Sequence, residues 1–268
     1  MRTSPWRRTS PWRRTPLAIG VLAAIGVAFI VVPIAALLIR APWSHLIDQL
    51  SSTGAWTALR LSLEVSLAAA ALSLVLGTPV AWVLARSSIR GRSLLRAIVI
   101  LPLVLPPVVG GVALLTALGR SGVVGRWLDA AGVQLTFTIW GAIVATTFVS
   151  IPLVILAAEA GLRSMDPRLE GAAAAMGASR AYVLRRVTLP LLRPQLAAGV
   201  VLAWARALGE FGATITFAGN LAGRTQTLPL AVYQTRQTDP GAAILISLLL
   251  VALSLVVLVV MRDRIFAR

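Results

Sequence analysis

Six long runs of apolar residues dominate the chain, and short segments rich in arginine separate them. The runs are Leu17–Ile39, Leu61–Ala85, Leu94–Leu118, Phe137–Leu162, Leu191–Ala218 and Ala242–Met261. Runs of about 20 residues are long enough to cross a hydrocarbon core of about 30 Å as an α-helix. No run alternates apolar and polar positions in the way that a membrane β-barrel requires. The pattern predicts an all-α integral membrane protein with six transmembrane helices.

Proline and glycine lie inside the second and third runs, so both helices are predicted to bend. The positions are Pro79 in the second run and Pro102, Pro106, Pro107, Gly110 and Gly111 in the third. Broken backbone is tolerated inside a membrane only where protein or a water-filled cavity satisfies its polar groups. Pro106 and Pro107 are therefore candidates for lining a translocation pathway, and a simple kink in the packing is the alternative.

Composition supports a membrane protein and excludes several kinds of site. Hydrophobic residues make up 58% of the chain, charged residues only 13%, and the mean hydropathy is +0.87. Soluble domains carry about 25% charged residues. The chain has no Cys and a single His, His45, so neither a thiolate nor a histidine-cluster metal site is expected.

The distribution of arginine predicts the orientation. All 25 basic residues are Arg; 18 lie in the two tails and the second and fourth connections, six lie in the alternate connections, and Arg206 lies within the fifth run. Cytoplasmic segments of membrane proteins carry the excess of Arg and Lys. The protein is therefore expected to be a multi-pass plasma-membrane protein with both termini in the cytoplasm. The net charge of +16 reflects this topology, and we expect no binding to nucleic acid.

Three regions follow from this topology. Residues 1–16 form a tail rich in Arg and Trp that is predicted to be disordered and cytoplasmic, residues 17–261 form the membrane domain, and residues 262–268 form a short cytoplasmic tail. The first run is too long for a signal-peptide core and lacks a small-residue cleavage site, so we expect it to remain as an anchor. The fourth connection, about 163–193, is the longest soluble piece within the membrane domain.

The absence of Lys has a mechanistic consequence. A nucleotide-binding loop of the Gly-x-x-x-x-Gly-Lys type needs its Lys to reach the terminal phosphates of ATP, and this chain has none. We therefore expect no cofactor in this chain and no ATPase site of its own. If ATP drives its work, a separate subunit binds and hydrolyses it.

The long connection is predicted to fold as two short helices. Glu170–Met176 is rich in alanine and favours a helix, and Gly177 can end that helix in a left-handed conformation. Ser179 can cap a second helix over 180–187. Leu189-Pro190 is then predicted to turn the chain back to the membrane.

These residues resemble the EAA motif of binding-protein-dependent ABC importers. The matching residues are Glu170, Ala172, Ala173, Gly177, Ala178, Leu189 and Pro190, with Gly171 where the first Ala is usual and Leu184 where an aromatic residue is common. The resemblance implies a coupling helix that sits in a groove of a cytoplasmic ATPase dimer. It further implies that Glu170 makes a charged contact with that ATPase while Ala172, Ala173 and Gly177 allow close approach.

A second stretch is similar to molybdate permeases. The similarity lies in ALGEFGATITFAGNLAGRTQTLPLAVYQ (residues 207–234) and in LPLVLPPVVGG (residues 101–111). Sulfate and thiosulfate permeases, the alternative, tend to have Glu-Tyr-Gly where this chain has Glu210-Phe211-Gly212. The resemblance implies uptake of molybdate, with tungstate inseparable, from an extracytoplasmic oxyanion-binding protein. It also implies a homodimer of this chain and alternating access driven by ATP.

The same stretch contains the residues that we single out for a gate or pathway. Arg206 and Glu210 are four residues apart, so they can pair on one helix face. The pair is either a buried structural ion pair or part of a gate, with Phe211, Gly212 and Thr214 just beyond it. An ion-driven transporter would need acidic sites near the midplane in repeated halves, and an enzyme would need clustered catalytic groups; neither pattern is present.

Overall fold

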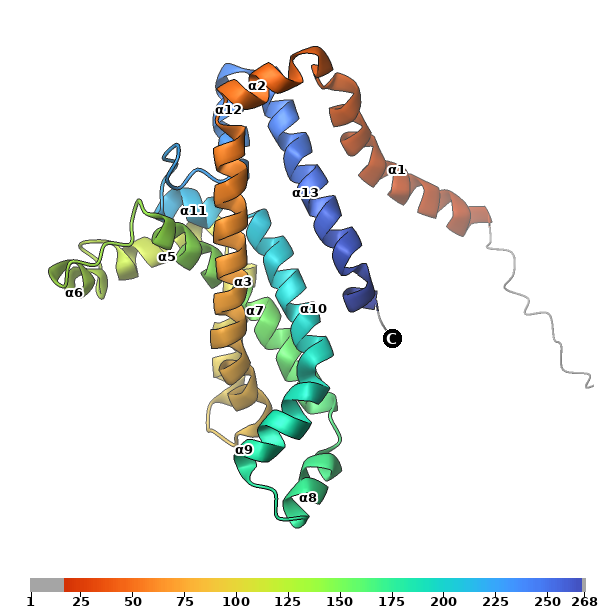
Figure 1. Cartoon of the computed structure of the whole chain (residues 1–268), viewed down its shortest axis with the longest axis vertical. Helices are drawn as coiled ribbons and strands as arrows, with labels where there is room; N and C mark the ends of the chain where they lie inside the picture. Colours follow the sequence, from red (N-terminus) through yellow and green to blue (C-terminus); the bar gives the residue numbers. More distant parts are fainter. Residues whose placement is uncertain (1–16, 267–268) are drawn as a thin grey trace, which may run out of the picture.

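The structure, a computed structural model, describes residues 17–266, with side chains described as far as residue 259, and every regular element in this range is helical (Figure 1). The elements are α1 (Leu17–Arg40), the 3₁₀ turn η2 (Trp43–His45), α2 (Leu46–Ser52), α3 (Ala55–Arg86), α4 (Arg92–Val104), α5 (Pro107–Leu118), α6 (Gly125–Ala130), α7 (Ile139–Ser164), α8 (Pro167–Ala175), α9 (Arg180–Val183), the π-helical turn η3 (Leu184–Thr188), α10 (Leu189–Leu208), α11 (Gly212–Phe217), α12 (Leu228–Thr238) and α13 (Pro240–Phe266). The predicted N-terminal tail, residues 1–16, and residues 267–268 lie outside the described range.

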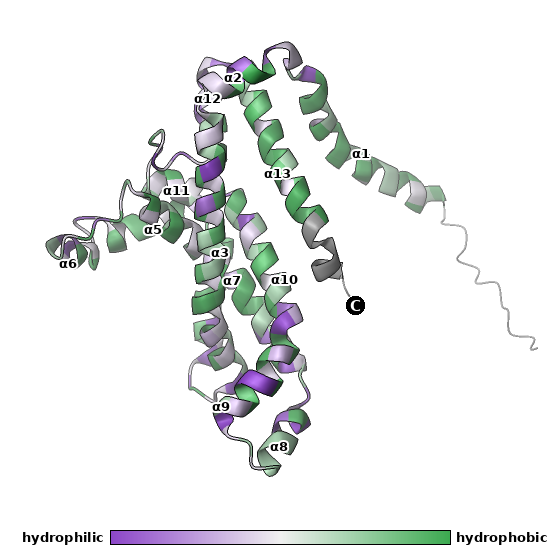
Figure 2. Ribbon diagram, in the orientation of Figure 1, coloured by the Kyte–Doolittle hydropathy of each residue, from purple (hydrophilic) through white to green (hydrophobic). Residues whose placement is uncertain are grey.

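The described helices agree with the predicted apolar runs. Five of them are long and apolar enough to cross a membrane, and α4 with α5, bent by 116° at the break between them, gives the sixth when the pair is counted as one span. The bend of the third run is therefore confirmed. Figure 2 shows hydrophobic residues along these helices and hydrophilic residues gathered toward the end that carries α8 and α9.

Pro79 lies inside the second span without interrupting it. Helix α3 runs as one element from Ala55 to Arg86 and packs along α7. Neighbouring helices can hold a proline-containing turn in place. Residues 262–266, predicted to belong to the C-terminal tail, continue α13 to Phe266; a helix need not end where its apolar run ends.

Small residues allow α3, α7 and α10 to pack closely and form the centre of the bundle. Gly77 of α3 faces Val154 and Ile155 of α7, and Gly199 of α10 faces Ala157 of α7, where an added Cβ would lie only 2.8 Å from the Ala157 side chain. Close approach of backbones at small residues is the usual basis of helix association in membranes. These glycines therefore let α3 and α10 approach α7 closely.

Buried polar side chains connect the same helices. Ser73 of α3 and Ser150 of α7 lie 3.2 Å apart through their hydroxyl oxygens, and the indole N–H of Trp204 in α10 donates to the Ser66 hydroxyl of α3 at 2.9 Å. Hydrogen bonds between helices contribute about 0.6–2 kcal/mol each in membrane proteins. They fix the rotation of each helix as well as its position.

The fifth apolar run is not one helix. It divides into α10, which ends at Leu208, and α11, which begins at Gly212, with Gly209, Glu210 and Phe211 between them. The continuous span predicted from its hydropathy was therefore wrong in this detail. Hydropathy gives the length of an apolar run. It does not reveal a break in the helix when contacts with another helix stabilise that break.

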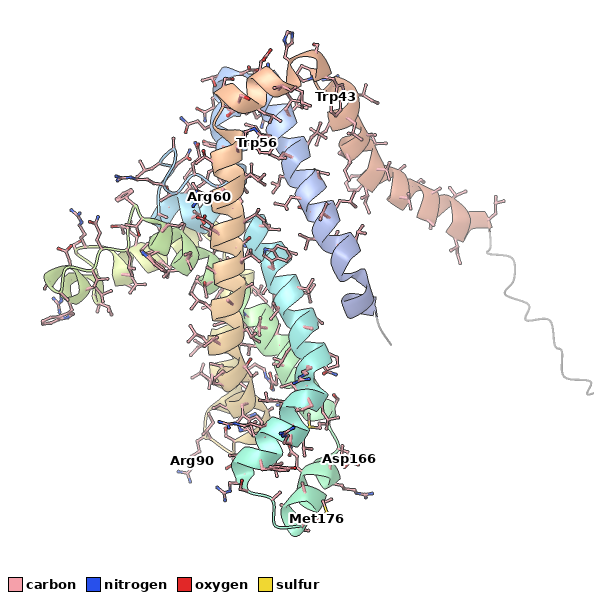
Figure 3. The ribbon with its side chains drawn as sticks, in the orientation of Figure 1. Trp43, Trp56, Arg60, Arg90, Asp166 and Met176 are labelled. Atoms are coloured by element: carbon pink, nitrogen blue, oxygen red, sulfur yellow. The ribbon has the colours of Figure 1, made fainter. Side chains whose placement is uncertain are left out.

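The bundle has two distinct ends (Figures 1 and 3). One end carries α2 and α12, with Trp43 and Trp56 close by, and the other carries α8 and α9, with Arg90, Asp166 and Met176 around them. At one side α1 leans away from the bundle, contacts α13 and has no buried residue. At the other side α5 and α6 extend outward.

Candidate functional site

The loop between the fourth and fifth spans folds as a compact helical hairpin. Asp166 caps α8 by accepting a hydrogen bond from the backbone N–H of Arg168 at 2.9 Å, and Pro167 occupies the first turn. Both features are favourable at a helix N-terminus. The sequence had predicted the helix over Glu170–Met176, and the structure extends it to Pro167–Ala175.

Gly177 ends α8 as predicted. Its φ is +83°, and the backbone N–H groups of Gly177 and Ala178 donate to the carbonyls of Ala174 and Ala173 at 3.0 and 3.1 Å. This is the Schellman arrangement, which satisfies the last carbonyls of a helix and favours Gly. Ser179 then caps α9 by accepting from the N–H of Tyr182 at 3.3 Å, which confirms the second predicted cap.

The predicted turn at Leu189-Pro190 is absent. Helices α9, η3 and α10 form one continuous helix over Arg180–Leu208, with both residues half-buried inside it. Pro190 lies in the first turn of α10, directly after the π-helical turn at 184–188. A π-turn shifts the hydrogen-bond register by one residue, so the helix passes through the Leu-Pro pair without a break.

Glu170 faces the bundle and has two partners there. Its Oε2 lies 3.2 Å from a guanidinium nitrogen of Arg86, the last residue of α3, and its Oε1 accepts a hydrogen bond from the Thr188 hydroxyl at 2.7 Å. The Glu170 and Arg86 side chains are 22% and 24% exposed, and Thr188 is 1% exposed. The carboxylate therefore joins α8 to α3 and to the π-turn.

The other motif residues divide between the inner and outer faces of the hairpin. Ala173 is buried, while Gly171 and Ala172 are exposed. The outer surface also carries three large exposed apolar side chains, which we call the hairpin tip: Leu169, Met176 and Tyr182, exposed by 48%, 83% and 56%. Figure 3 shows Met176 at the extreme end of the molecule.

A cleft lies between α8, α9 and the end of α3. It has a volume of about 660 Å³, and Glu170 and Arg180 lie in its lining with the ring of Trp82. The cleft therefore lies next to the contact of Glu170 with Arg86, between the hairpin and the end of α3.

A buried ion cluster lies beside the hairpin. Glu159 of α7, 4% exposed, pairs with Arg96 of α4 and with Arg163 of its own helix, whose Nε lies 2.9 Å from Oε1. A nitrogen of Arg163 also donates to the carbonyl of Leu84 in α3 at 3.4 Å. The pairing of Glu159 with Arg163 was predicted from their spacing; Arg96 was not. The cluster joins the ends of α3, α4 and α7.

The predicted pair in the fifth span forms at its break. Arg206 Nη1 lies 2.6 Å from Glu210 Oε2, and the other oxygen of Glu210 accepts from the backbone N–H of Ala213 at 2.7 Å. The Glu210 side chain is 1% exposed and that of Arg206 is 31% exposed. The Glu210 carboxylate therefore neutralises Arg206 and also accepts a hydrogen bond from a free backbone N–H in the first turn of α11.

Residues from the third and fifth spans meet at this break. An added Cβ on Gly212 would lie 2.7 Å from the side chain of Pro107 and 3.1 Å from the backbone nitrogen of Val108. Gly111 meets α11 in the same way, with Thr216 and Ala213 as its neighbours. The structure thus brings Pro107 of the predicted pathway next to Gly212; Pro106 caps the start of α5.

The remaining predicted pathway residues point in different directions. Phe211 packs against Tyr233 of α12, with ring centroids 5.1 Å apart and planes tilted by 53°. Thr214 is 1% exposed, and its hydroxyl oxygen lies 3.4 Å from that of Thr146 in α7. Thr146 had no local signal in the sequence, because its partner is 68 positions away.

A hollow with charged residues in its lining lies toward the opposite end of the bundle. It has a volume of about 460 Å³ and is lined by α3, the start of α7 and the loop before α12, with Arg60, Glu64 and Arg224 among its residues. Arg60 and Glu64 pair at 2.6 Å, as their spacing predicts. Arg224, on the loop, adds a second cation.

Comparison with known proteins gives matches over most of the chain. Residues 73–265 match the family described as binding-protein-dependent transport system inner membrane component. The molybdenum transport system permease protein ModB of Mycobacterium tuberculosis is 47% identical over 237 residues, covering 88% of this chain and 89% of the relative. ModB of Escherichia coli K12 is 42% identical over 80% of this chain and 93% of the relative.

A sulfate transport relative and two solved structures also match. The sulfate transport system permease protein CysW of Synechocystis is 38% identical over 73% of this chain and 72% of its own length. A bacterial alginate ABC transporter in complex with a periplasmic protein superposes with a TM-score of 0.71 at 22% identity, covering 93% of this chain and 94% of that one. The MetNI methionine ABC transporter gives 0.59 at 20% identity, covering 88% and 97%.

Proposed function

This chain belongs to the family of binding-protein-dependent transport system inner membrane components, and we propose that it is the permease subunit of an ATP-driven importer of molybdate, with tungstate inseparable. The observation that carries the substrate is the 47% identity to a molybdenum permease over 88% of the chain. The sulfate permease relative is less similar, at 38% over 73%. Sulfate is therefore the second candidate.

The hairpin of α8 and α9 is the proposed docking site for a separate ATPase subunit. It projects from the end of the bundle, and its tip exposes Leu169, Met176 and Tyr182 where the rest of the hairpin surface is polar or small. Clustered exposed apolar side chains are typical of interaction sites. The partner binds and hydrolyses ATP, because this chain has no Lys with which to build a nucleotide-binding loop of that type.

The arginine distribution supports an orientation with the hairpin and both termini in the cytoplasm. The end that carries α2 and α12 would then face outward and receive the oxyanion from a binding protein. In the outer hollow Glu64 neutralises Arg60, so Arg224 is the cation there that would attract a dianion. The break at Gly209–Phe211 lies deeper, between that mouth and the cytoplasmic end.

Two copies of the chain are proposed to form the pathway. The exposed faces of α4 and α5 carry Val104, Val108, Val109 and Val112, next to the crossing of α5 with α11. A second copy on this face would enclose the broken segments. Irregular backbone inside a membrane needs protein or water beside it to satisfy its polar groups. Closure of the ATPase subunits would move the hairpins and open the pathway alternately to each side.

The direct test is uptake of labelled molybdate by cells that lack only this gene, with and without the restored gene. Excess unlabelled sulfate is added in a parallel assay. We expect uptake to return with the gene and to resist sulfate. In a molybdate system the binding protein selects molybdate over sulfate before it delivers the oxyanion to the permease. Uptake abolished by sulfate would instead support the sulfate permease. Molybdate uptake that does not depend on the gene would contradict the molybdate proposal.

A further inference from the structure

Glu170 is tied to the bundle by contacts that local sequence does not reveal. Its two carboxylate oxygens have separate partners: Arg86 at 3.2 Å and the Thr188 hydroxyl at 2.7 Å. These partners come from the end of α3 and from the π-turn before α10. Both oxygens are therefore engaged within the chain, and the side chain is only 22% exposed.

The ion pair is the polar connection between the hairpin and α3. Helix α8 packs chiefly on α9 and η3, which precede α10 in the same continuous helix. Arg86 reaches it from a different span, and Arg86 also contacts the sulfur of Met165 just before α8. Helix α8 is thus connected to the rest of the bundle by two routes: through α9 and η3 into α10, and through the ion pair with Arg86 to α3.

The π-turn places the second partner. Thr188 closes η3, is 1% exposed, and directs its hydroxyl to Glu170 Oε1 while lying 3.5 Å from the carbonyl of Val183. A π-turn alters the register of the helix that follows it and is frequent at functional sites. Here the altered register gives Glu170 a buried hydroxyl donor at the point where α9 continues into α10.

We propose that Arg86 and Thr188 position Glu170 so that the hairpin keeps a fixed angle to α3, and that the Arg86–Glu170 pair passes ATP-driven motion of the hairpin into α3. This inference rests on the proposed function. It gives Glu170 an inward role, in addition to the contact with the ATPase that the family motif implies. The exposed tip at Leu169, Met176 and Tyr182 adds apolar surface for the ATPase.

The test uses the assembled transporter, with its ATPase and binding protein, in proteoliposomes. Molybdate uptake and ATP hydrolysis are measured together, so that the readout is molybdate moved per ATP. The variants are Arg86→Ala, Thr188→Val, the single variants Arg86→Glu and Glu170→Arg, and the charge exchange that combines these two. Arg90→Ala is the matched control, because Arg90 is an exposed arginine on the same connection with no ion pair among the described residues.

We expect Arg86→Ala to assemble normally and to lower molybdate moved per ATP by about tenfold, within the usual range of coupling between sites. Thr188→Val should change the ratio in the same direction by less, since it keeps the charge pair. The charge exchange should recover most of the ratio, whereas Arg90→Ala should leave it unchanged. A loss of folding alone would lower the amount of complex and would not change the ratio.

Two results would overturn the positioning role. One is an Arg86→Ala ratio equal to that of Arg90→Ala; the other is a charge exchange as impaired as its worse single variant, which would assign Glu170 a different partner. Failure of the wild-type chain to capture an ATPase or to take up molybdate would instead overturn the proposed function. The wild-type control therefore separates the two conclusions.

Discussion

Arginine neutralises each deeply buried carboxylate among the described residues. Glu159 and Glu210 are 4% and 3% exposed, and each has an arginine within one helical turn. An ionised group without a partner is costly in the low-dielectric interior of a membrane protein. These pairs could be predicted because i,i+4 spacing places side chains on one face. The partners Arg86 and Arg96 could not, since tertiary contact alone brings them to Glu170 and Glu159.

The Arg206–Glu210 pair should stabilise the break between α10 and α11. Arg206→Met should lower the free energy of unfolding by about 3–5 kcal/mol, because it leaves a buried charge unpaired. Adding Glu210→Gln should recover most of this loss, since the amide oxygen can still accept from Ala213 N–H. Thermal unfolding of the purified chain in detergent measures both changes.

Outcomes of the double variant decide between the two roles that the sequence leaves open for this pair. A double variant that is as unstable as Arg206→Met would contradict the structural ion pair. Recovery of both stability and molybdate uptake would assign the pair a structural role alone. Recovery of stability without uptake would place the charges in the pathway or its gate.

At the scale of the elements, two helices that cross at the membrane core are held together by glycines. Gly111 of α5 and Gly212 of α11 lie where an added Cβ would come within 2.6–2.7 Å of the opposing helix. The sequence suggested an irregular third span from its prolines and glycines. It did not indicate that α11 is the helix lying against it.

Gly111→Ala should destabilise this crossing by about 1–3 kcal/mol, the usual cost of overpacking. The new methyl group would meet Thr216 Cβ at 2.6 Å and the backbone oxygen of Ala213 at 3.0 Å. Gly20→Ala is the matched control, because Gly20 also lies in an apolar helix and has nothing within 4 Å of its Cβ position. The midpoint of thermal unfolding should fall for Gly111→Ala and not for Gly20→Ala; equal midpoints would show that the crossing is loose.

At the scale of the whole molecule, a large part of the apolar surface has no partner within the chain. Helix α1 is strongly apolar and has no buried residue, and α4, most of whose apolar residues follow Arg92 and Arg96, has none either. Lipid can cover α1. The broken span of α4 and α5 is a different case, because irregular backbone inside a membrane needs protein or water beside it.

A second copy on the face of α4 and α5 can be detected by cross-linking. The chain has no native cysteine, so single Cys substitutions at Val108, Val109 or Val112, all about half exposed, report only on neighbouring molecules. We expect a dimer on mild oxidation of membranes for at least one position, since disulfides need Cα atoms within about 7 Å. Val75→Cys, exposed on α3, is the control that should remain monomeric. Absence of dimer at all three positions would contradict this arrangement.

Sequence alone determined the positions of the apolar runs, the caps of α8 and α9, and the absence of a Lys-containing nucleotide-binding loop. These features depend on the length of an apolar run or on residues within one or two helical turns. The tertiary structure alone decided that the chain continues as a helix through Pro190, that it breaks at Gly209–Phe211, and that Glu170 faces Arg86 and Thr188. Each of these depends on contacts between segments distant in the chain, or on a shift in helical register, which local hydropathy and spacing do not record.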